Sequence, residues 1–336
     1  MTSERVREIL ERLPGFGILV VGDLILDEFV WGRVTRISPE APVPVVEVDS
    51  ESYYPGGAAN VARNLREFAE RVYVMGSVGV GGHADHLARL LREHRISLEC
   101  LQQDPDYQTI VKTWIIAKHQ QVVRVDREKK MGLSAIQAER AIQQIEEMLP
   151  RLDAIIFEDY GKGLLEQGLV DRIIALANKA GKIVTVDPNP RNRLTWSFVT
   201  AVTPNRSEAF AAAGQPWTDP VEPAMDDANL LEVGRILLTK WKVENLLITL
   251  SEQGMMLFTN DRPPFCIPTR AQEVFDVSGA GDTAIALFTL ALCGGATAIE
   301  AAEISNHASG IVVGKLGTAT VTVAELLASF IAPRSE

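Results

Sequence analysis

The sequence predicts an α/β protein with a central, mostly parallel sheet, helices on both faces and a small separate β-sheet that forms a lid. Short apolar runs alternate with helical patterns along most of the chain, which is typical of parallel strands joined by helices. The first run ends in Gly22 and is followed by Asp23, and open α/β sheets bind ligands at such strand ends. Two pairs of alternating segments interrupt this order and predict the second sheet.

The elements begin with an amphipathic helix within residues 1–12. The segment FGILVVG at 16–22 predicts a buried strand, because it is almost entirely apolar and ends in glycine. Similar short runs predict strands at 72–78, 153–157, 183–186, 201–203 and 245–249. Apolar residues at helical spacing predict helices at 84–94, 134–149, 164–180, 206–213, 227–241 and 284–293. We expect one domain over residues 1–336, because no linker or repeat divides the chain.

The lid is predicted from strand pairs inserted between the strand–helix units, at about 29–49 and 109–126. Within each insertion, two β-type segments lie close together, as in a hairpin. Such a small sheet has exposed edges, and exposed edges favour pairing with another chain. We therefore expect a homodimer in which the lids of two copies meet.

Composition excludes several classes of protein. The chain has 336 residues, 46% of them hydrophobic, and a net charge of −11, so a nucleic-acid or membrane-surface partner is not expected. Its three cysteines are widely separated and form no CxxC, which argues against a disulfide framework or a zinc site. No signal-peptide pattern and no long apolar span is visible. We expect a cytoplasmic protein.

The segment DVSGAGDT at 276–283 is the most informative stretch of the sequence. Gly279, Ala280 and Gly281 are small enough to turn tightly and direct backbone N–H groups toward an anion, and a helix N-terminus behind them adds positive charge. Asp282 can accept a proton from a hydroxyl nucleophile. The chain contains neither a GxxxxGK[ST] phosphate loop nor an intact GxGxxG, so Walker-type and dinucleotide-binding proteins are excluded.

Three motifs in the same order and spacing resemble the ribokinase-like (PfkB) sugar kinases. They are GGAAN at 56–60, TPNRSE at 203–208, which contains an NxxE pattern, and DVSGAGDT at 276–283. Four further segments resemble the heptose-7-phosphate kinases of ADP-heptose synthesis: RISPEAPVPV at 36–45, DYGKG at 159–163, AQEV at 271–274 and GKLGT at 314–318. No HxGH-like nucleotidyltransferase motif occurs in these residues, so the resemblance implies the kinase part of that pathway's protein.

The resemblance implies an ATP-dependent sugar kinase that uses Mg²⁺, and it leaves open a monovalent cation such as K⁺. Asp282 would be the catalytic base, and Gly279, Ala280 and Gly281 would bind the transferred phosphoryl group. Asn205 and Glu208 would organise Mg²⁺, largely through water. The sugar would contact Asp23, Gly56, Gly57 and Asn60, and the nucleotide would contact Asn205, Ser251, Gly254, Asn306 and Gly310.

A phosphorylated sugar also needs cations, and Arg124 and Lys162 are the candidates in the lid and in the DYGKG segment. Two positions depart from the heptose-kinase pattern, because Trp114 stands where Arg is common and Asn189 where Lys is common. These departures leave two alternatives open. One is a ribokinase-like kinase for another sugar, sugar phosphate or nucleoside, and the other is a nucleotide-binding regulatory protein that has lost catalysis.

Overall fold

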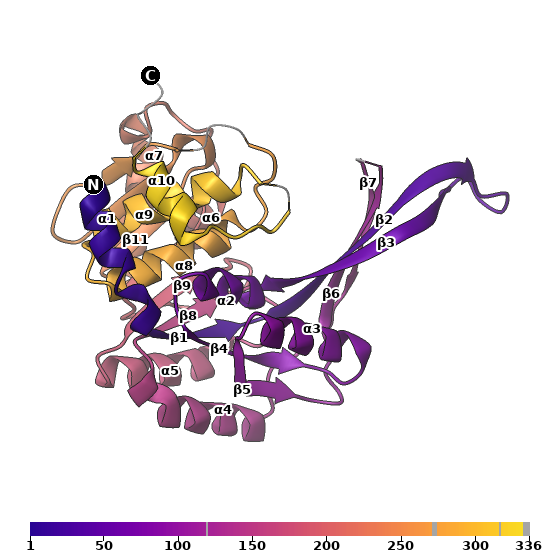
Figure 1. The fold of residues 1–336 in the computed structure, drawn as a ribbon. Helices are drawn as coiled ribbons and strands as arrows, with labels where there is room; N and C mark the ends of the chain where they lie inside the picture. Colours follow the sequence, from indigo (N-terminus) through magenta and orange to yellow (C-terminus); the bar gives the residue numbers. More distant parts are fainter. Residues whose placement is uncertain (119, 271–273, 316, 332–336) are drawn as a thin grey trace.

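The computed structural model describes residues 1–118, 120–270, 274–315 and 317–331, and its main element is a nine-stranded sheet (Figure 1). Seven neighbouring strands run parallel, and the last two at one edge run antiparallel to their neighbours. The strand order is β13 (Phe265–Ile267), β12 (Met255–Thr259), β11 (Asn245–Thr249), β10 (Ala201–Val202), β9 (Ile183–Asp187), β8 (Ala154–Glu158), β1 (Gly17–Gly22), β4 (Arg71–Val78) and β5 (Ser97–Gln103). The predicted parallel sheet is confirmed, whereas β5, β12 and β13 were not predicted.

Helices cover both faces of this sheet, as the sequence predicts. Along β1, Ile18 and Val20 join one apolar cluster, and Leu19 and Val21 join the other, because successive side chains of a strand point to opposite faces. The first cluster is formed with α1 (Ser3–Leu10), α2 (Ala58–Arg66), α3 (Gly82–Glu93), α8 (Ala280–Cys293), α9 (Ala298–Val312) and α10 (Val323–Ser329). The second is formed with α4 (Ala135–Met148), α5 (Gln167–Lys179), α6 (Arg206–Ala213) and α7 (Ala228–Trp241).

The lid is a four-stranded sheet with the order β3 (Pro44–Gly57), β2 (Leu24–Ile37), β6 (Ile110–Ala117) and β7 (Gln120–Arg127). The antiparallel pairs β2–β3 and β6–β7 confirm the two predicted hairpin-like insertions. The strands β2 and β3 are longer than predicted, because β2 starts two residues after β1 and β3 ends where α2 begins. The lid is therefore continuous with β1, an interior strand of the main sheet.

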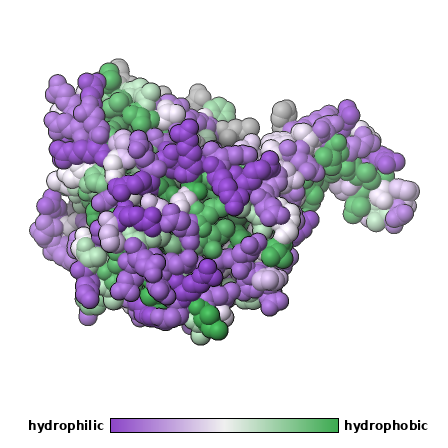
Figure 2. Space-filling view, turned by 60° about the horizontal axis from the view of Figure 1, so that its bottom comes forward, coloured by the Kyte–Doolittle hydropathy of each residue, from purple (hydrophilic) through white to green (hydrophobic). Residues whose placement is uncertain are grey.

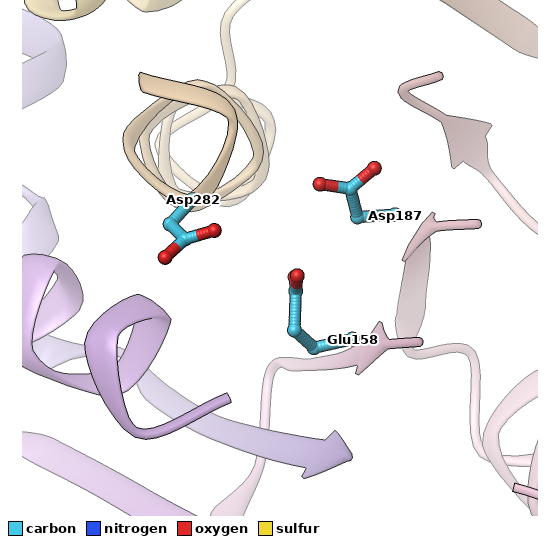
Figure 3. A group of neighbouring side chains, drawn as sticks. All are labelled: Glu158, Asp187 and Asp282. Carbon is cyan, nitrogen blue, oxygen red and sulfur yellow. The ribbon is translucent and has the colours of Figure 1, made fainter. Parts of the chain in front are cut away.

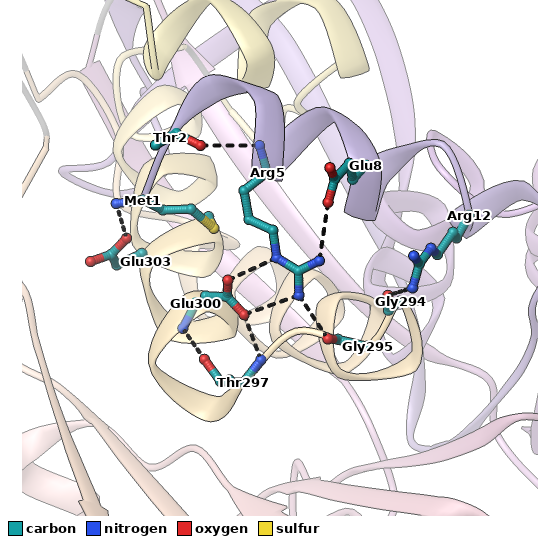
Figure 4. A network of polar contacts seen from close by, with 10 residues as sticks. All are labelled: Met1, Thr2, Arg5, Glu8, Arg12, Gly294, Gly295, Thr297, Glu300 and Glu303. Atoms are coloured by element: carbon teal, nitrogen blue, oxygen red, sulfur yellow. Dashed lines mark hydrogen bonds and ion pairs between the residues drawn. The ribbon is translucent and has the colours of Figure 1, made fainter.

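Among the residues that the structure describes, no helix is both long and apolar enough to cross a membrane. The N-terminal helix α1 instead packs against the turn between α8 and α9, where Arg5 forms a polar network (Figure 4). Its guanidinium donates to Glu300 Oε1 at 2.9 Å and to the carbonyl of Gly295 at 3.0 Å. Glu300 also accepts a hydrogen bond from the N–H of Thr297 and so caps α9. This network holds the N-terminal helix α1 against the helices α8 and α9.

The ion pair between Arg5 and Glu300 predicts a pH-dependent contribution to stability. The hydrogen bond from Arg5 lowers the pKa of Glu300 to about 2, against about 4.3 in an unfolded chain. A lowered folded-state pKa stabilises the protein above the unfolded value, and this stabilisation is lost as the pH falls through the range between the two values. Glu300→Gln keeps the helix cap and should lower Tm by a few degrees at pH 7, with the difference closing below pH 4.

Thermal unfolding followed by circular dichroism at pH 7 and at pH 2.5 tests this expectation. Glu8→Gln is the matched control, because Glu8 contacts the same guanidinium at 3.3 Å but is mostly exposed. A difference in Tm between Glu300→Gln and the wild type that persists unchanged at pH 2.5 would contradict the prediction.

Candidate active site

Carboxylates gather where the central strands of the main sheet end. Glu158 is the last residue of β8, Asp187 is the last residue of β9, and Asp282 lies in the first turn of α8. Oxygen atoms of these three side chains lie within 4.8 Å of one another (Figure 3). Glu158 is 2% exposed, it points between the other two carboxylates, and its Oε2 has no hydrogen-bond partner among the described residues. This arrangement can hold a metal ion.

Asp282 is held by hydrogen bonds from two other elements. Asn60 Nδ2 donates to Asp282 Oδ2 at 2.6 Å, and the hydroxyl of Tyr160 donates to Asp282 Oδ1 at 3.2 Å. The preceding turn needs glycine, because Gly279 has a φ of 79° and a Cβ there would lie 2.9 Å from Asn60 Nδ2. The predicted motifs at 56–60 and 276–283 therefore meet directly, although Asn60 and Asp282 are 222 residues apart.

The start of α2 brings the predicted sugar-contacting residues together. Gly57 has a φ of 57°, and a Cβ at this position would lie 2.5 Å from the carbonyl oxygen of Asp23. The neighbouring Gly56 leaves room for the carboxylate of Asp27, which a Cβ would overlap. Asp23 is 1% exposed and accepts a hydrogen bond from the backbone N–H of Lys162 at 2.9 Å. This side of the site thus presents the carboxylates of Asp23 and Asp27. It also presents Asn60 Oδ1, a buried acceptor without a partner in the described chain.

The carboxylates of this site have raised pKa values. Burial is the largest cause, and repulsion between neighbouring carboxylates adds to it. Burial raises the pKa of Asp27 to about 6 and that of Asp159 to about 7. Burial also raises the pKa of Asp282, while the hydrogen bonds from Asn60 and Tyr160 act in the opposite direction. For Glu158 and Asp187, burial comes first and repulsion by neighbouring carboxylates adds to it, so that both pKa values lie well above normal. A cation placed among these groups would remove that penalty.

The two predicted cations at the sugar side are both engaged with carboxylates. Arg124 makes two hydrogen bonds to Asp126, at 2.8 and 2.9 Å, and Lys162 Nζ lies 2.6 Å from Glu128. A third cation, Lys112, was not predicted. Its ammonium lies 5.0 Å from the ring centre of Tyr160 and favours the charged forms of Asp27 and Asp282. Lys112 and Trp114 lie two residues apart in a strand and therefore share one face of the lid, and this spacing was the signal that the sequence offered for Lys112. Using the signal required knowing which strand pairs with this one.

Asn205 and Glu208 lie at the start of α6, where they form a reciprocal cap. Asn205 Oδ1 accepts the N–H of Glu208 at 3.0 Å, and Glu208 Oε2 accepts the N–H of Asn205 at 2.8 Å. Glu208 also lines a cavity of about 400 Å³ together with Asn189, Pro190, Arg191, Ser207 and Ala211. Asn189 therefore lies beside Glu208, and its Nδ2 is also 3.4 Å from the position of a Cβ at Gly161 in the DYGKG segment. The cavity offers Arg191 as a lining cation.

The remaining predicted nucleotide residues cluster around the segment 267–269. Gly254 has a φ of 88°, and a Cβ there would overlap the carbonyl of Ile267. Its neighbour Ser251 starts the short turn η4 (Ser251–Gln253) with a φ of 54°. Asn306 Nδ2 donates to the carbonyl of Pro268 at 2.8 Å, and Gly310 lies one helical turn farther along α9. The structure thus brings these four residues to one region.

Parts of two predicted motifs lie outside the described residues: 271–273 of AQEV and position 316 of GKLGT. The described residues on either side connect two loops. Asp276 accepts hydrogen bonds from the N–H groups of Ser278 at 2.9 Å and Gly317 at 3.2 Å. The loop in front of α8 is therefore fastened to the loop that follows α9.

A glycine turn at a helix N-terminus, a buried carboxylate beside it and a lid sheet over a parallel sheet define a phosphotransferase of the ribokinase-like class. The chain belongs to the pfkB family of carbohydrate kinases, whose family model matches residues 17–324. It is therefore an ATP-dependent carbohydrate kinase, and the alternative of a regulatory protein without catalysis is not supported.

Several curated relatives of this chain share one name. "Bifunctional protein HldE" of Desulfatibacillum aliphaticivorans is 41% identical over 311 residues, which cover 93% of this chain and 62% of that protein. The protein of the same name from Photorhabdus laumondii subsp. laumondii is 40% identical over 317 residues, which cover 94% of this chain and 64% of that protein. The chain thus spans less than two thirds of the length of these relatives.

Solved structures support the fold. Arabidopsis thaliana ribokinase in complex with ribose and ATP has a TM-score of 0.70 and 16% identity, covering 95% of this chain and all of the other. Escherichia coli phosphofructokinase-2 in complex with potassium has a TM-score of 0.75 and 17% identity, covering 94% of this chain and 98% of the other.

Proposed function

We propose that the protein phosphorylates the C1 hydroxyl of D-glycero-D-manno-heptose 7-phosphate, giving the 1,7-bisphosphate used for ADP-heptose and the lipopolysaccharide core. The observation that carries the kinase chemistry is the position of Asp282, buried in the first turn of α8 between donors from Asn60 and Tyr160. The choice of heptose 7-phosphate is supported by the four heptose-kinase segments and by about 40% identity to the HldE proteins. The cytoplasm, where ATP is available, is the proposed location.

Asp282 acts in this proposal as the base that takes the proton from the C1 hydroxyl. Its burial raises its pKa, which makes the carboxylate a better proton acceptor than an exposed aspartate. The N–H groups of Gly279 and Gly281 and the N-terminal end of α8 face the phosphoryl group, where negative charge builds up during transfer, while the N–H of Ala280 donates to the carbonyl of Val277 at 3.2 Å. Asp23, Gly56, Gly57 and Asn60 hold the sugar hydroxyls, with the uncommitted Asn60 Oδ1 accepting one of them.

Mg²⁺ fits the carboxylates Glu158 and Asp187, with Asp282 left as the base, better than the predicted pair Asn205 and Glu208. Mg²⁺ prefers oxygen ligands, and these two carboxylates offer them within 4.8 Å, including the unpartnered Glu158 Oε2. Asn205 Oδ1 is already used by two hydrogen bonds at the start of α6. Mg²⁺ would neutralise phosphate charge during transfer. Glu208 contributes negative charge near this cluster, since it raises the pKa of Asp187.

The nucleotide is placed along α6, η4 and α9 in this proposal. Its phosphates would occupy the cavity of about 400 Å³ beside Asn205 and Glu208, with Arg191 as a cation at the rim. The adenosine part would lie against Ser251, Gly254, Asn306 and Gly310, which gather around residues 267–269. A monovalent cation such as K⁺ remains part of the proposal.

The rate of ADP formation with Mg²⁺ tests the acceptor, using heptose 7-phosphate, fructose 6-phosphate, ribose, fructose and adenosine. The heptose phosphate should be the efficient acceptor, and Asp282→Asn should lower kcat by about 10²- to 10⁴-fold while ATP still binds. Asp261→Asn is the control, because this carboxylate is exposed and forms an ion pair with the neighbouring Arg262. Efficient turnover of another acceptor instead would favour the alternative kinase, a reading that Trp114 and Asn189 motivate.

Removing one carboxylate of the cluster tests the metal site. Glu158→Gln should raise the Mg²⁺ concentration for half-maximal rate by about 10- to 100-fold, because one anionic ligand is lost. Without metal, the same variant should melt at a higher temperature than the wild type, since it relieves repulsion among buried carboxylates. Glu208→Gln is the comparison variant. A larger increase in the Mg²⁺ concentration for half-maximal rate in Glu208→Gln than in Glu158→Gln would indicate that Mg²⁺ binds at the start of α6.

We further propose that two copies dimerise through their lids. The pairing of β2 with β6 ends at Gly32 and Ala117, so among the described residues the outer parts of β2 and β3 pair only with each other, and they project from the main body (Figure 1). An isolated two-stranded ribbon is marginally stable in water, and apolar side chains gather along this arm (Figure 2). The exposed apolar residues of the lid include Val34, Ile37, Val43, Val48, Val123 and Val125.

A charge on the arm should separate the dimer. Val48 is 56% exposed, and Val48→Lys would place an ammonium in the proposed interface at a desolvation cost. Sedimentation velocity should show a dimer for the wild type and a monomer for this variant. Ile136→Lys serves as the control, because Ile136 is 83% exposed on α4, a helix that packs on the main sheet. A monomeric wild type at working concentration would contradict the proposal.

A further inference from the structure

The segment 214–227, which joins α6 to α7, is fastened by one buried arginine. All of its residues are described, and its regular structure is the short turn η3 (Ala224–Asp226). Arg206, the first residue of α6, is 6% exposed. Its guanidinium lies over the rings of Phe210 and Trp217, 4.7 and 5.4 Å from their centres. The side chain of Arg206 is therefore covered by aromatic groups from the helix and from the segment.

The polar contacts of Arg206 tie the segment to both helices. Its Nη2 donates to the carbonyls of Thr218 at 3.2 Å and Asp219 at 3.5 Å, and lies 2.7 Å from Asp227 Oδ2. Asp227 is 1% exposed and caps α7, since its Oδ1 accepts the N–H of Leu230 at 3.0 Å. One nitrogen of Arg206 thus joins α6, the segment and the start of α7.

Val221 connects this segment to η4. Its N–H donates to Asp227 Oδ2 at 3.4 Å, and its carbonyl accepts a hydrogen bond from Gln253 Nε2 at 2.9 Å. Gln253 is the last residue of η4, the turn that begins with Ser251 and is followed by Gly254. Because both backbone groups of Val221 are bonded, the position of η4 depends on where Asp227 holds the segment.

A second connection joins the start of α6 to η4 directly. Asn205 forms a β-bridge with Thr249, and the N–H of Thr249 donates to the carbonyl of Pro204 at 3.0 Å. Thr249 is the last residue of β11, and η4 starts two residues later. The start of α6 and η4 are therefore linked by two separate paths, one through β11 and one through the segment 214–227. Two paths between the same ends form a closed ring of contacts, which fixes their spacing more firmly than one path.

The pair of Arg206 and Asp227 supplies direction more than stability. Removing both charges from water offsets most of their attraction, and apolar side chains of similar volume often stabilise a protein as well. In addition, Nε and Nη1 of Arg206 are buried without a hydrogen-bond partner in the described chain, which costs free energy. A planar guanidinium, however, fixes the directions of the oxygens that it binds. Directed contacts of this kind suit a role in positioning.

We propose that Arg206, Asp227 and Gln253 are positioning residues for the nucleotide, because they set the distance between the start of α6 and η4. The inference rests on the proposed function, in which the phosphates lie at the start of α6 and the adenosine lies at η4. One ATP molecule must reach both places, so the ring of contacts holds them at the spacing of its two ends. The three side chains act through the backbone of the site, and they act on the nucleotide rather than on the acceptor.

Gln253→Leu tests the inference without leaving a buried charge. It should raise the KM for ATP and the Kd of ADP by about 3- to 10-fold, the loss expected for one neutral hydrogen bond, and leave the KM for the acceptor unchanged. Asn260→Leu is the matched control, because Asn260 Nδ2 donates to the carbonyl of Val243 at 2.9 Å at the opposite end of β11 and β12. This control should lower Tm by a similar amount and leave both nucleotide constants unchanged.

Variants of Arg206 test the other end of the same path. Arg206→Lys keeps a charge beside Asp227 but cannot hold the carboxylate and two carbonyls in one plane. It should fold more stably than Arg206→Met, which leaves Asp227 unpaired, and yet bind ADP about 10-fold more weakly than the wild type. Adding Gln253→Leu to Arg206→Lys should weaken ADP binding little further, since contacts in one path are not additive. Calorimetry measures ADP binding in each variant.

Three results would overturn the inference: unchanged nucleotide constants in Gln253→Leu, equal increases in Asn260→Leu, or an equal increase in the KM for the acceptor. The outcomes also separate the inference from the proposed function, because ADP binding needs no acceptor. A wild type that prefers another acceptor, with an ADP affinity that falls in Gln253→Leu, supports the inference and contradicts the heptose assignment. A heptose-phosphate kinase whose ADP affinity is independent of Gln253 and Arg206 retains the function and contradicts the inference.

Discussion

The crowding of carboxylates at the ends of β8 and β9 and at the start of α8 is the constraint on which the rest of this structure depends. Three carboxylates share a volume in which oxygen atoms lie within 4.8 Å, and Asp27 adds a further charge that repels Asp282. Buried like charges raise one another's pKa values and favour protonation. This repulsion is offset by hydrogen-bond donors and by an ammonium group from the lid. The site also has room for a divalent cation.

The donors come from segments that are far apart in the sequence, so the site is also a junction of the fold. Asn60 reaches Asp282 from α2, and Tyr160 reaches it from the turn after β8. The contact from Asn60 depends on Gly57 and Gly279, which both have a positive φ, because a side chain at either position would displace a neighbour. The continuous path from β1 through Asp23 into β2 joins this junction to the lid. Acceptor contacts and lid geometry are therefore coupled through one strand.

Much of the fold could be predicted because local patterns dictate it. The strand at β1 and the helix over α6 follow from a buried apolar run and from a reciprocal cap, and both occur where expected. The edge strands β12 and β13 were missed, because they are short and antiparallel and depart from the strand–helix alternation. The inner halves of β2 and β3 were also missed. They carry Asp27 and the two glycines, which have low strand propensity and acquire order only by pairing across the lid.

The sequence by itself determined the order of the elements and the glycine turn at 279–281, because small residues, caps and apolar periodicity act over a few neighbouring positions. Only the tertiary structure decided which charges meet. Glu158 and Asp187 join Asp282 because parallel strands end at one edge, and Lys112 lies opposite Asp27 of β2 and Asp126 of β7 while Arg124 and Lys162 form ion pairs. Such pairings depend on strand order and register, and these arise from packing between segments that no local pattern relates.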